Sequence, residues 1–172
     1  FDISCVTGSS VQLYSDAVSS GTAATCAGGT VTLTTGVLAA GARSITAVQT
    51  DSAGNASAAS SALSVTIDTG NPAAPAALAL ASADDTGTSN SDRITKNTSA
   101  LTISGTSEAN ATVRLYQPNS SGTLLATLTA DGSGNWSGDI SLAEGSYTVV
   151  ATARDAAGNT GSDSTGLSIT VD

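Results

Sequence analysis

The sequence predicts an all-β chain made of two tandem β-sandwiches. A repeated stretch carries most of this prediction: Asp51–Asn55 (Asp-Ser-Ala-Gly-Asn) precedes the run Ala62–Asp68, and Asp155–Asn159 (Asp-Ala-Ala-Gly-Asn) precedes Gly166–Asp172. The two copies lie 104 positions apart, which indicates a tandem repeat. Each run alternates aliphatic residues with Ser or Thr, as a half-buried strand does. A composition rich in Thr, Ser, Val, Ala and Gly also favours strands and turns over helices.

The first unit is predicted to span residues 1–68. Turn-like residues lie at Ser15–Gly21 and Leu38–Gly41. They separate four expected strands: Val11–Tyr14, Gly29–Leu38, Ala42–Gln49 and Ala62–Asp68. Residues 69–75 are predicted to be a short linker, because two prolines stiffen the chain and cannot continue a hydrogen-bonded ladder.

The second unit is predicted to span residues 76–172. Seven short strands with turns every 8–12 residues indicate an immunoglobulin-like (Ig-like) sandwich. The expected strands are Ala76–Ala81, Leu101–Gly105, Ala111–Tyr116, Leu124–Ala130, Trp136–Leu142, Ser146–Arg154 and Thr160–Asp172. The chain has only five aromatic residues, so the cores should be aliphatic, with Trp136 as core filling.

The alignment of the two units shows that the first is incomplete at its front. Val11–Tyr14 matches Val113–Tyr116, which places Phe1 opposite Ile103. The first sandwich therefore lacks its N-terminal strand and the start of the next. Its front is cut away, or separated from it by an insertion, or replaced by a strand from another chain.

The only two cysteines lie in the first unit, at positions expected to share one pole of the sandwich. Cys5 aligns with Ser107 at the end of one strand, and Cys26 aligns with Ala130 at the end of another. We therefore expect a Cys5–Cys26 disulfide, with two buried thiols as the alternative.

Charge and composition exclude several classes of function. The chain has 14 acidic and 5 basic residues, a net charge of −9, and no histidine. The absence of a basic patch argues against nucleic acid and anionic membranes as partners. No Ser-His-Asp set and no His or Cys metal set is present, so an enzyme is not expected. No signal peptide or transmembrane run is found.

The acidic residues either keep the protein soluble or bind a hard cation such as Ca²⁺. In an Ig-like sandwich, three loops of the second unit should share the pole that faces the linker. These loops carry Glu108, Asp131 and Asp155, and Asp68 ends the first unit just before the linker. Clustered carboxylates repel one another unless a cation neutralises them. The sequence thus predicts a Ca²⁺ site at the domain junction that would lock the hinge.

A second acidic loop spans Asp84–Asp92 and should lie at the other pole, near Asp172. Asp84, Asp85 and Asp92 are candidate Ca²⁺ ligands there, although the loop lacks the pattern of an EF-hand. The alternative is an ordinary acidic surface loop. In the first unit, Val6 and Ala27 replace Glu108 and Asp131, so no tight Ca²⁺ site is expected at the equivalent pole.

These motifs resemble bacterial immunoglobulin-like repeats of giant RTX-type, type I-secreted surface adhesins. The resemblance rests on four stretches: Gly105–Val113, Asp131–Ser137, Asp155–Asn159 and the Leu-Ser-Ile-Thr-Val-Asp ending. It implies an extracellular location at the bacterial surface, an extender role and Ca²⁺ at domain junctions. The ligands it implies are Asp68, Glu108, Asp131 and Asp155, with Asn159 through an oxygen.

Three functions follow as hypotheses. The first is a Ca²⁺-rigidified extender that contacts neighbouring repeats and projects a distal binding domain for adhesion or biofilm formation. The second is a module that itself binds a glycan or protein, although few aromatic residues are available for stacking. The third is a sandwich that a partner strand completes.

Overall fold

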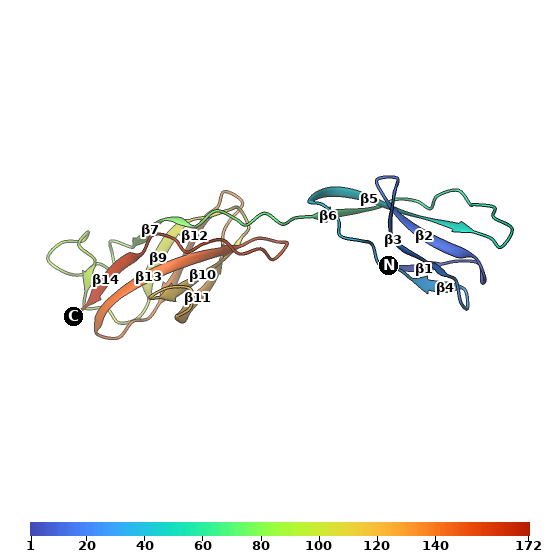
Figure 1. The fold of residues 1–172 in the computed structure, drawn as a ribbon. Coiled ribbons are helices and arrows are strands. Elements are labelled where there is room, and N and C mark those ends of the chain that lie inside the picture. Colours follow the sequence, from blue (N-terminus) through green and yellow to red (C-terminus); the bar gives the residue numbers. More distant parts are fainter. The chain divides into compact units, whose positions relative to one another are not determined.

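The computed structural model describes residues 1–172, which form strands β1–β14 and no helix (Figure 1). The chain divides into unit 1, Phe1–Thr69, and unit 2, Gly70–Asp172. Each unit pairs two sheets across its own aliphatic core, which confirms two tandem Ig-like sandwiches. No segment forms a helix with the length and hydropathy that a membrane span requires.

Unit 2 is a sandwich of a five-stranded and a three-stranded sheet. The larger sheet has the order β11 (Thr123–Thr129), β10 (Thr112–Gln117), β13 (Gly145–Arg154), β14 (Leu167–Val171) and β8 (Ile94–Thr95). The smaller has the order β12 (Asn135–Ile140), β9 (Leu101–Thr106) and β7 (Ala76–Leu80). All pairs are antiparallel except β14 with β8. Alternate side chains point inward, including fully buried Leu101, Ile103, Val113, Leu115 and Val149.

Unit 1 repeats this plan without its front. The larger sheet has the order β3 (Val18–Thr25), β2 (Ser10–Ser15), β5 (Gly41–Thr50) and β6 (Leu63–Ile67). The smaller contains only β1 (Asp2–Ser4) and β4 (Thr30–Thr32). No counterpart of β7 or β8 is present, as the alignment predicts. The core is correspondingly small: Val11, Leu13, Cys26, Leu33 and Ile45.

Strand β3 lies partly where the sequence predicts a turn. The turn is only Asp16–Ala17, with φ of 51° and 66°, the left-handed pair that a two-residue hairpin requires. The Asp16 carboxylate fixes this turn by accepting a hydrogen bond from the Ser44 amide and by forming an ion pair with Arg43. Strand β3 is rich in Ser, Thr and Ala and mostly exposed, so it carries no hydrophobic alternation that would reveal it.

Other predicted strands are shorter in the structure. Within the expected Gly29–Leu38 strand only β4 forms, and within Thr160–Asp172 only β14 is a strand, apart from an isolated bridge at Thr160. The residues before β14 instead lie beside β13 without forming a regular ladder. The Ser164 amide donates to the Ala151 carbonyl, and the Ala151 amide donates to the Ser164 hydroxyl. The short strand β8 was not expected, whereas β1 is the end of the strand that the alignment places just before Cys5.

Two residues of the expected linker pack into unit 2. Pro72 and Pro75 are both buried. Gly161 lies against the Pro72 carbonyl, where a β-carbon would clash with it. The boundary between the units therefore falls between Thr69 and Gly70.

The two cores fill one equivalent cross-strand position with side chains of different size. In unit 2, Trp136 on β12 faces Gly105 on β9. In unit 1, the pair is Val31 on β4 and Ile3 on β1. Trp136 is 3% exposed, which confirms it as core filling, and the missing β-carbon of Gly105 makes room for the indole. The indole N–H donates to no protein acceptor.

Cys5 and Cys26 form the predicted disulfide in unit 1. Cys5 follows β1 of the small sheet and Cys26 follows β3 of the large one, so the bond ties the two sheets together. Cys26 is fully buried, and backbone bonds fix both residues: the Cys5 amide donates to Gly29, and the Cys26 amide donates to Ser9. The disulfide thus reinforces a sandwich that has a small core.

Reducing this disulfide should destabilise unit 1 selectively. The bond joins residues 21 positions apart, and closing a loop of this size stabilises a fold by about 3 kcal/mol. Calorimetry should therefore show one transition moving to lower temperature in reductant or in Cys5→Ser/Cys26→Ser. The control is Trp136 fluorescence, which reports unit 2 alone; an equal shift there would contradict the prediction.

Candidate functional site

Three turns of the same design lie at the loop ends of the two sandwiches. They are Asp51–Asn55, Asp131–Asn135 and Asp155–Asn159, and in each the Asp amide donates to the Asn carbonyl. The Asp side chain closes the turn from inside. In the third, Asp155 Oδ1 accepts from the amides of Gly158 at 2.7 Å and Asn159 at 2.9 Å, and Oδ2 accepts from the Asn159 side chain at 2.8 Å.

These hydrogen bonds lower the pKa of all three carboxyl groups. For Asp51 and Asp155, the first cause is the bond from the side chain of the paired Asn, which favours the charged form. For Asp131, the first cause is the backbone amide of Asn135, which donates at 2.9 Å. The carboxylates are therefore structural parts of their own turns, whatever else they bind.

The structure brings together two of the predicted ligand loops in unit 2. The Asn110 amide donates to the Asp131 carbonyl, and the Ser107 amide donates to Gly134, so the loop of Glu108 lies against the turn of Asp131. Glu108 is exposed and its carboxylate accepts no hydrogen bond. Asp131 Oδ2 has only a long contact, 3.5 Å, to the Asn135 side chain. Both groups have oxygens open to a further partner.

The remaining predicted ligands lie apart or are already engaged. Asn159 turns its amide nitrogen toward Asp155, so it orients that carboxylate. Asp68 follows β6 in unit 1 and is exposed. Within neither unit do three carboxylates gather closely enough to hold a metal ion. The donor set fits Ca²⁺ chemically, because every member offers oxygen.

The Asp84–Asp92 loop lies beside the C-terminal strand, as predicted: Thr170 donates to Arg93, and Asp172 donates to Thr95. Its carboxylates mainly brace the loop. Asp84 accepts from the Thr102 amide at 2.9 Å, and Asp92 accepts from the Ile94 amide at 3.1 Å.

Asp85 differs from its neighbours in this loop. It is 5% exposed, and its Oδ2 accepts from the Arg93 amide at 2.9 Å. Its Oδ1 is buried without a protein partner. Asp85 is therefore the loop carboxylate with unused buried hydrogen-bonding capacity.

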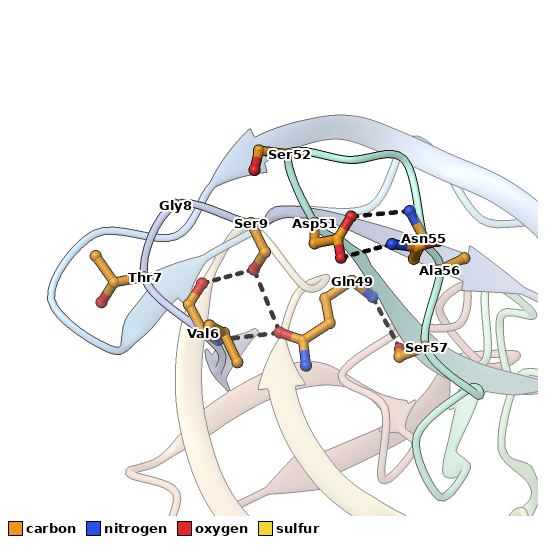
Figure 2. Close-up of a pocket in the computed structure, with 10 residues that line it drawn as sticks. All are labelled: Val6, Thr7, Gly8, Ser9, Gln49, Asp51, Ser52, Asn55, Ala56 and Ser57. Atoms are coloured by element: carbon orange, nitrogen blue, oxygen red, sulfur yellow. Dashed lines mark hydrogen bonds between the residues drawn. The ribbon is translucent and has the colours of Figure 1, made fainter.

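The equivalent pole of unit 1 carries an open pocket of about 610 Å³ (Figure 2). Gln49 is central to it: its Oε1 accepts from the Val6 amide at 3.0 Å and from the Ser9 hydroxyl at 3.3 Å. Asp51 is the only charged side chain in the lining, and Asn55 holds its carboxylate. The remaining lining combines hydroxyl and amide groups with the apolar side chains of Val6 and Ala56.

Sequence reasoning missed Gln49. The inward positions of β5 are Ile45, Ala47 and Gln49, and the last aligns with Ala153 of unit 2. The available signal was a long polar side chain at an inward position of a strand. Since unit 2 has alanine there, only unit 1 fixes its first loop through this amide.

Comparison with known proteins identifies both units. The sequence profile of the bacterial Ig-like domain matches residues 1–69 and 72–172. Fibronectin(III)-like modules of Clostridium thermocellum CbhA align over 100% of this chain and 85% of their own, at 19% identity and a TM-score of 0.53, which supports the sandwich fold. A biofilm-associated protein BSP domain aligns over 95% of this chain and 25% of its own, at 16% identity and a TM-score of 0.38. No curated protein sequence matches.

The Asp-closed turns should make unit 2 sensitive to acid. A carboxyl group whose pKa is lowered by folding stabilises the fold above its unfolded pKa, near 3.8, and this contribution is lost as the pH falls through the folded value. Urea unfolding followed by Trp136 fluorescence should therefore show less loss of stability between about pH 5 and pH 2 for Asp155→Ala than for wild type. Ser162→Ala, an exposed change in the same unit, should keep wild-type acid sensitivity. Identical profiles for Asp155→Ala and wild type would contradict the prediction.

Proposed function

Since the chain belongs to the bacterial Ig-like domain family, we propose that it is an extender segment of a bacterial cell-surface adhesin. In this role, its sandwiches space a distal binding domain from the cell, and Ca²⁺ at domain junctions limits hinge motion. The observation that carries the proposal is the tandem arrangement of two sandwiches with only a short connection between their units. The net charge of −9 is compatible with an extracellular, cation-rich setting.

The geometry of unit 2 supports a cation at the linker-facing pole. The chain enters this unit beside Gly161, and Ala76 pairs with Thr106, immediately before the loop of Glu108. Glu108 and Asp131 therefore lie near the entering chain, and both have oxygens available. Asp68 would supply a ligand from unit 1, and Asp155 with Asn159 would complete the set. A second ion could use Asp85 Oδ1, with Asp84 and Asp92 from the same loop.

We expect Ca²⁺ to raise the melting temperature and restrict the arrangement of the two units. At a free Ca²⁺ concentration 100 times the dissociation constant, binding stabilises a folded protein by about 2.7 kcal/mol. Isothermal titration, calorimetry and small-angle scattering should each respond to Ca²⁺ and reverse with EDTA. Asp68→Asn/Glu108→Gln should abolish the change in the scattering profile, because these residues belong to the junction site.

Two controls separate specific binding from general charge screening. Glu144→Gln removes an exposed carboxylate from a different loop of unit 2 and should leave Ca²⁺ binding unchanged. An excess of NaCl should not reproduce the effect of Ca²⁺. If the scattering profile and melting temperature are the same in Ca²⁺ and in EDTA, the Ca²⁺ part of the proposal fails.

A second candidate function is ligand binding at the pole of unit 1. It is favoured by the pocket of about 610 Å³ around Gln49, whose hydroxyl and amide groups suit a neutral polar ligand such as a glycan. If this pocket binds sugar, a glycan array should give reproducible hits with the whole chain. Gln49→Ala should remove them by releasing the Val6–Ser9 loop, whereas Ser162→Ala in unit 2 should not. An array without hits, or hits that survive Gln49→Ala, would contradict this function.

A further inference from the structure

A pocket of about 420 Å³ lies between the two sheets of unit 2. Residues 75–78, at the start of β7 on the edge of the small sheet, form one wall, and residues 165–167, at the start of β14, form the other. Arg93, just before β8, completes the lining. Since β8 pairs only with Thr170 and Val171 of β14, the pocket occupies the part of the seam between the sheets that β8 does not cover.

The strands beside this pocket leave only a short free edge. In β7, the register with β9 shifts between Ala76 and Ala79, and Ala77 has a φ of 54°. In β14, the Thr170 amide donates across the edge toward β8, and backbone groups alternate along a strand, so the Ser168 amide faces the same edge. Strand addition requires a regular run of main-chain bonds, which an irregular strand and β8 prevent here. The geometry therefore favours a compact ligand over an added strand.

The buried part of the lining is apolar and its exposed part is polar. Leu167 is 4% exposed and belongs to the core of unit 2, and the half-buried Leu78 packs against the same core. Pro75 is buried as well. Thr165, in contrast, is exposed and offers a hydroxyl group. This combination of apolar surface with a few polar groups is typical of small-ligand sites.

Arg93 supplies the only charge in the lining, and its guanidinium forms no hydrogen bond or ion pair within the protein. Two carboxylates of the same loop are engaged by main-chain amides instead. Asp85 Oδ2 accepts from the Arg93 amide at 2.9 Å, and Asp92 Oδ1 accepts from the Ile94 amide at 3.1 Å. The guanidinium at the pocket is therefore available to an anion from outside.

The backbone of Arg93 has a conformation that does not favour a side chain. Its φ is 62°, in the left-handed region that residues other than glycine seldom adopt. Two hydrogen bonds hold it there: its amide donates to Asp85, and its carbonyl accepts from Thr170 at 2.9 Å. Glycine would fit this position with less strain, so the use of arginine points to a role for the cation itself.

We propose that this pocket binds an acidic sugar, that is, a pyranose ring that carries a carboxylate. The planar guanidinium of Arg93 matches a carboxylate through two parallel N–H bonds. The ring covers Leu78 and Leu167, and its hydroxyl groups bond the Thr165 hydroxyl and the Ser168 amide. A volume of about 420 Å³ is near the lower end for small-ligand pockets, which suits a single ring. This site is independent of the proposed extender role and of Ca²⁺.

The test is a titration of the whole ¹⁵N-labelled chain with methyl β-glucuronide, followed by NMR in the presence of EDTA. Saturable shifts should appear at the amides of Arg93, Leu167 and Ser168, and methyl β-glucoside, which lacks the carboxylate, should not produce them. Arg93→Gln should weaken binding on the order of tenfold or more, because the ligand loses a charge-assisted pair of hydrogen bonds. Arg93→Gly should also lose binding while the melting temperature stays equal or rises, since it relieves the backbone.

Matched controls separate this site from a general effect of charge. Arg114→Gln removes an exposed cation from β10 and should bind like wild type. Acetate, a carboxylate without a ring, should bind more weakly than the glucuronide. The proposal is overturned if these amides do not shift, if Arg93→Gln binds as well as wild type, or if Arg114→Gln loses as much affinity. Equal binding of the glucoside or of acetate overturns it as well, because the carboxylate or the ring would then not be recognised.

Discussion

A sandwich of two sheets keeps its core dry only if something crosses between the sheets at each open side. In unit 2, one segment meets this requirement by pairing with β9 in the small sheet and β14 in the large one. Every inward residue of β14 is consequently buried, as are both prolines that begin the segment. In unit 1, the disulfide ties the two sheets at one pole. The burial of β14 in unit 2 therefore depends on this one crossing segment.

The acidic turns are closed by their own hydrogen bonds. Asp-x-x-Gly-Asn closes on itself through its own backbone, and the glycine takes the left-handed conformation that the turn requires, with φ of 89°, 84° and 99° in the three copies. Since the turn is complete without a metal, it can persist where its neighbours lose their carboxylates. Unit 1 illustrates this: Val6 and Ala27 leave Asp51 without acidic neighbours, yet its turn has the same bonds.

The sequence was sufficient to predict the fold because the two units carry the same motifs at one spacing. That spacing placed Cys5 near Cys26, identified the missing front of unit 1 and located the core strands. It placed the end of β3 at Cys26 but not its start, because the Ser, Thr and Ala side chains of this strand lack alternation and its ladder to β2 holds it. Nor could it separate a carboxylate that binds a cation from one that closes its own turn, because both uses require Asp near Gly and Asn. Gln49 was missed for a related reason: its role depends on a loop forty residues away in sequence.

The facing pairs Ile3 with Val31 and Gly105 with Trp136 divide the space at one equivalent position differently, which has a consequence for folding. Neighbouring repeats of similar sequence are prone to exchange strands while they fold. A hybrid that placed Ile3 against Trp136 would be overpacked, and one that placed Gly105 against Val31 would contain a void. Both defects destabilise a core. The size mismatch thus disfavours the pairing of these strands across the two units.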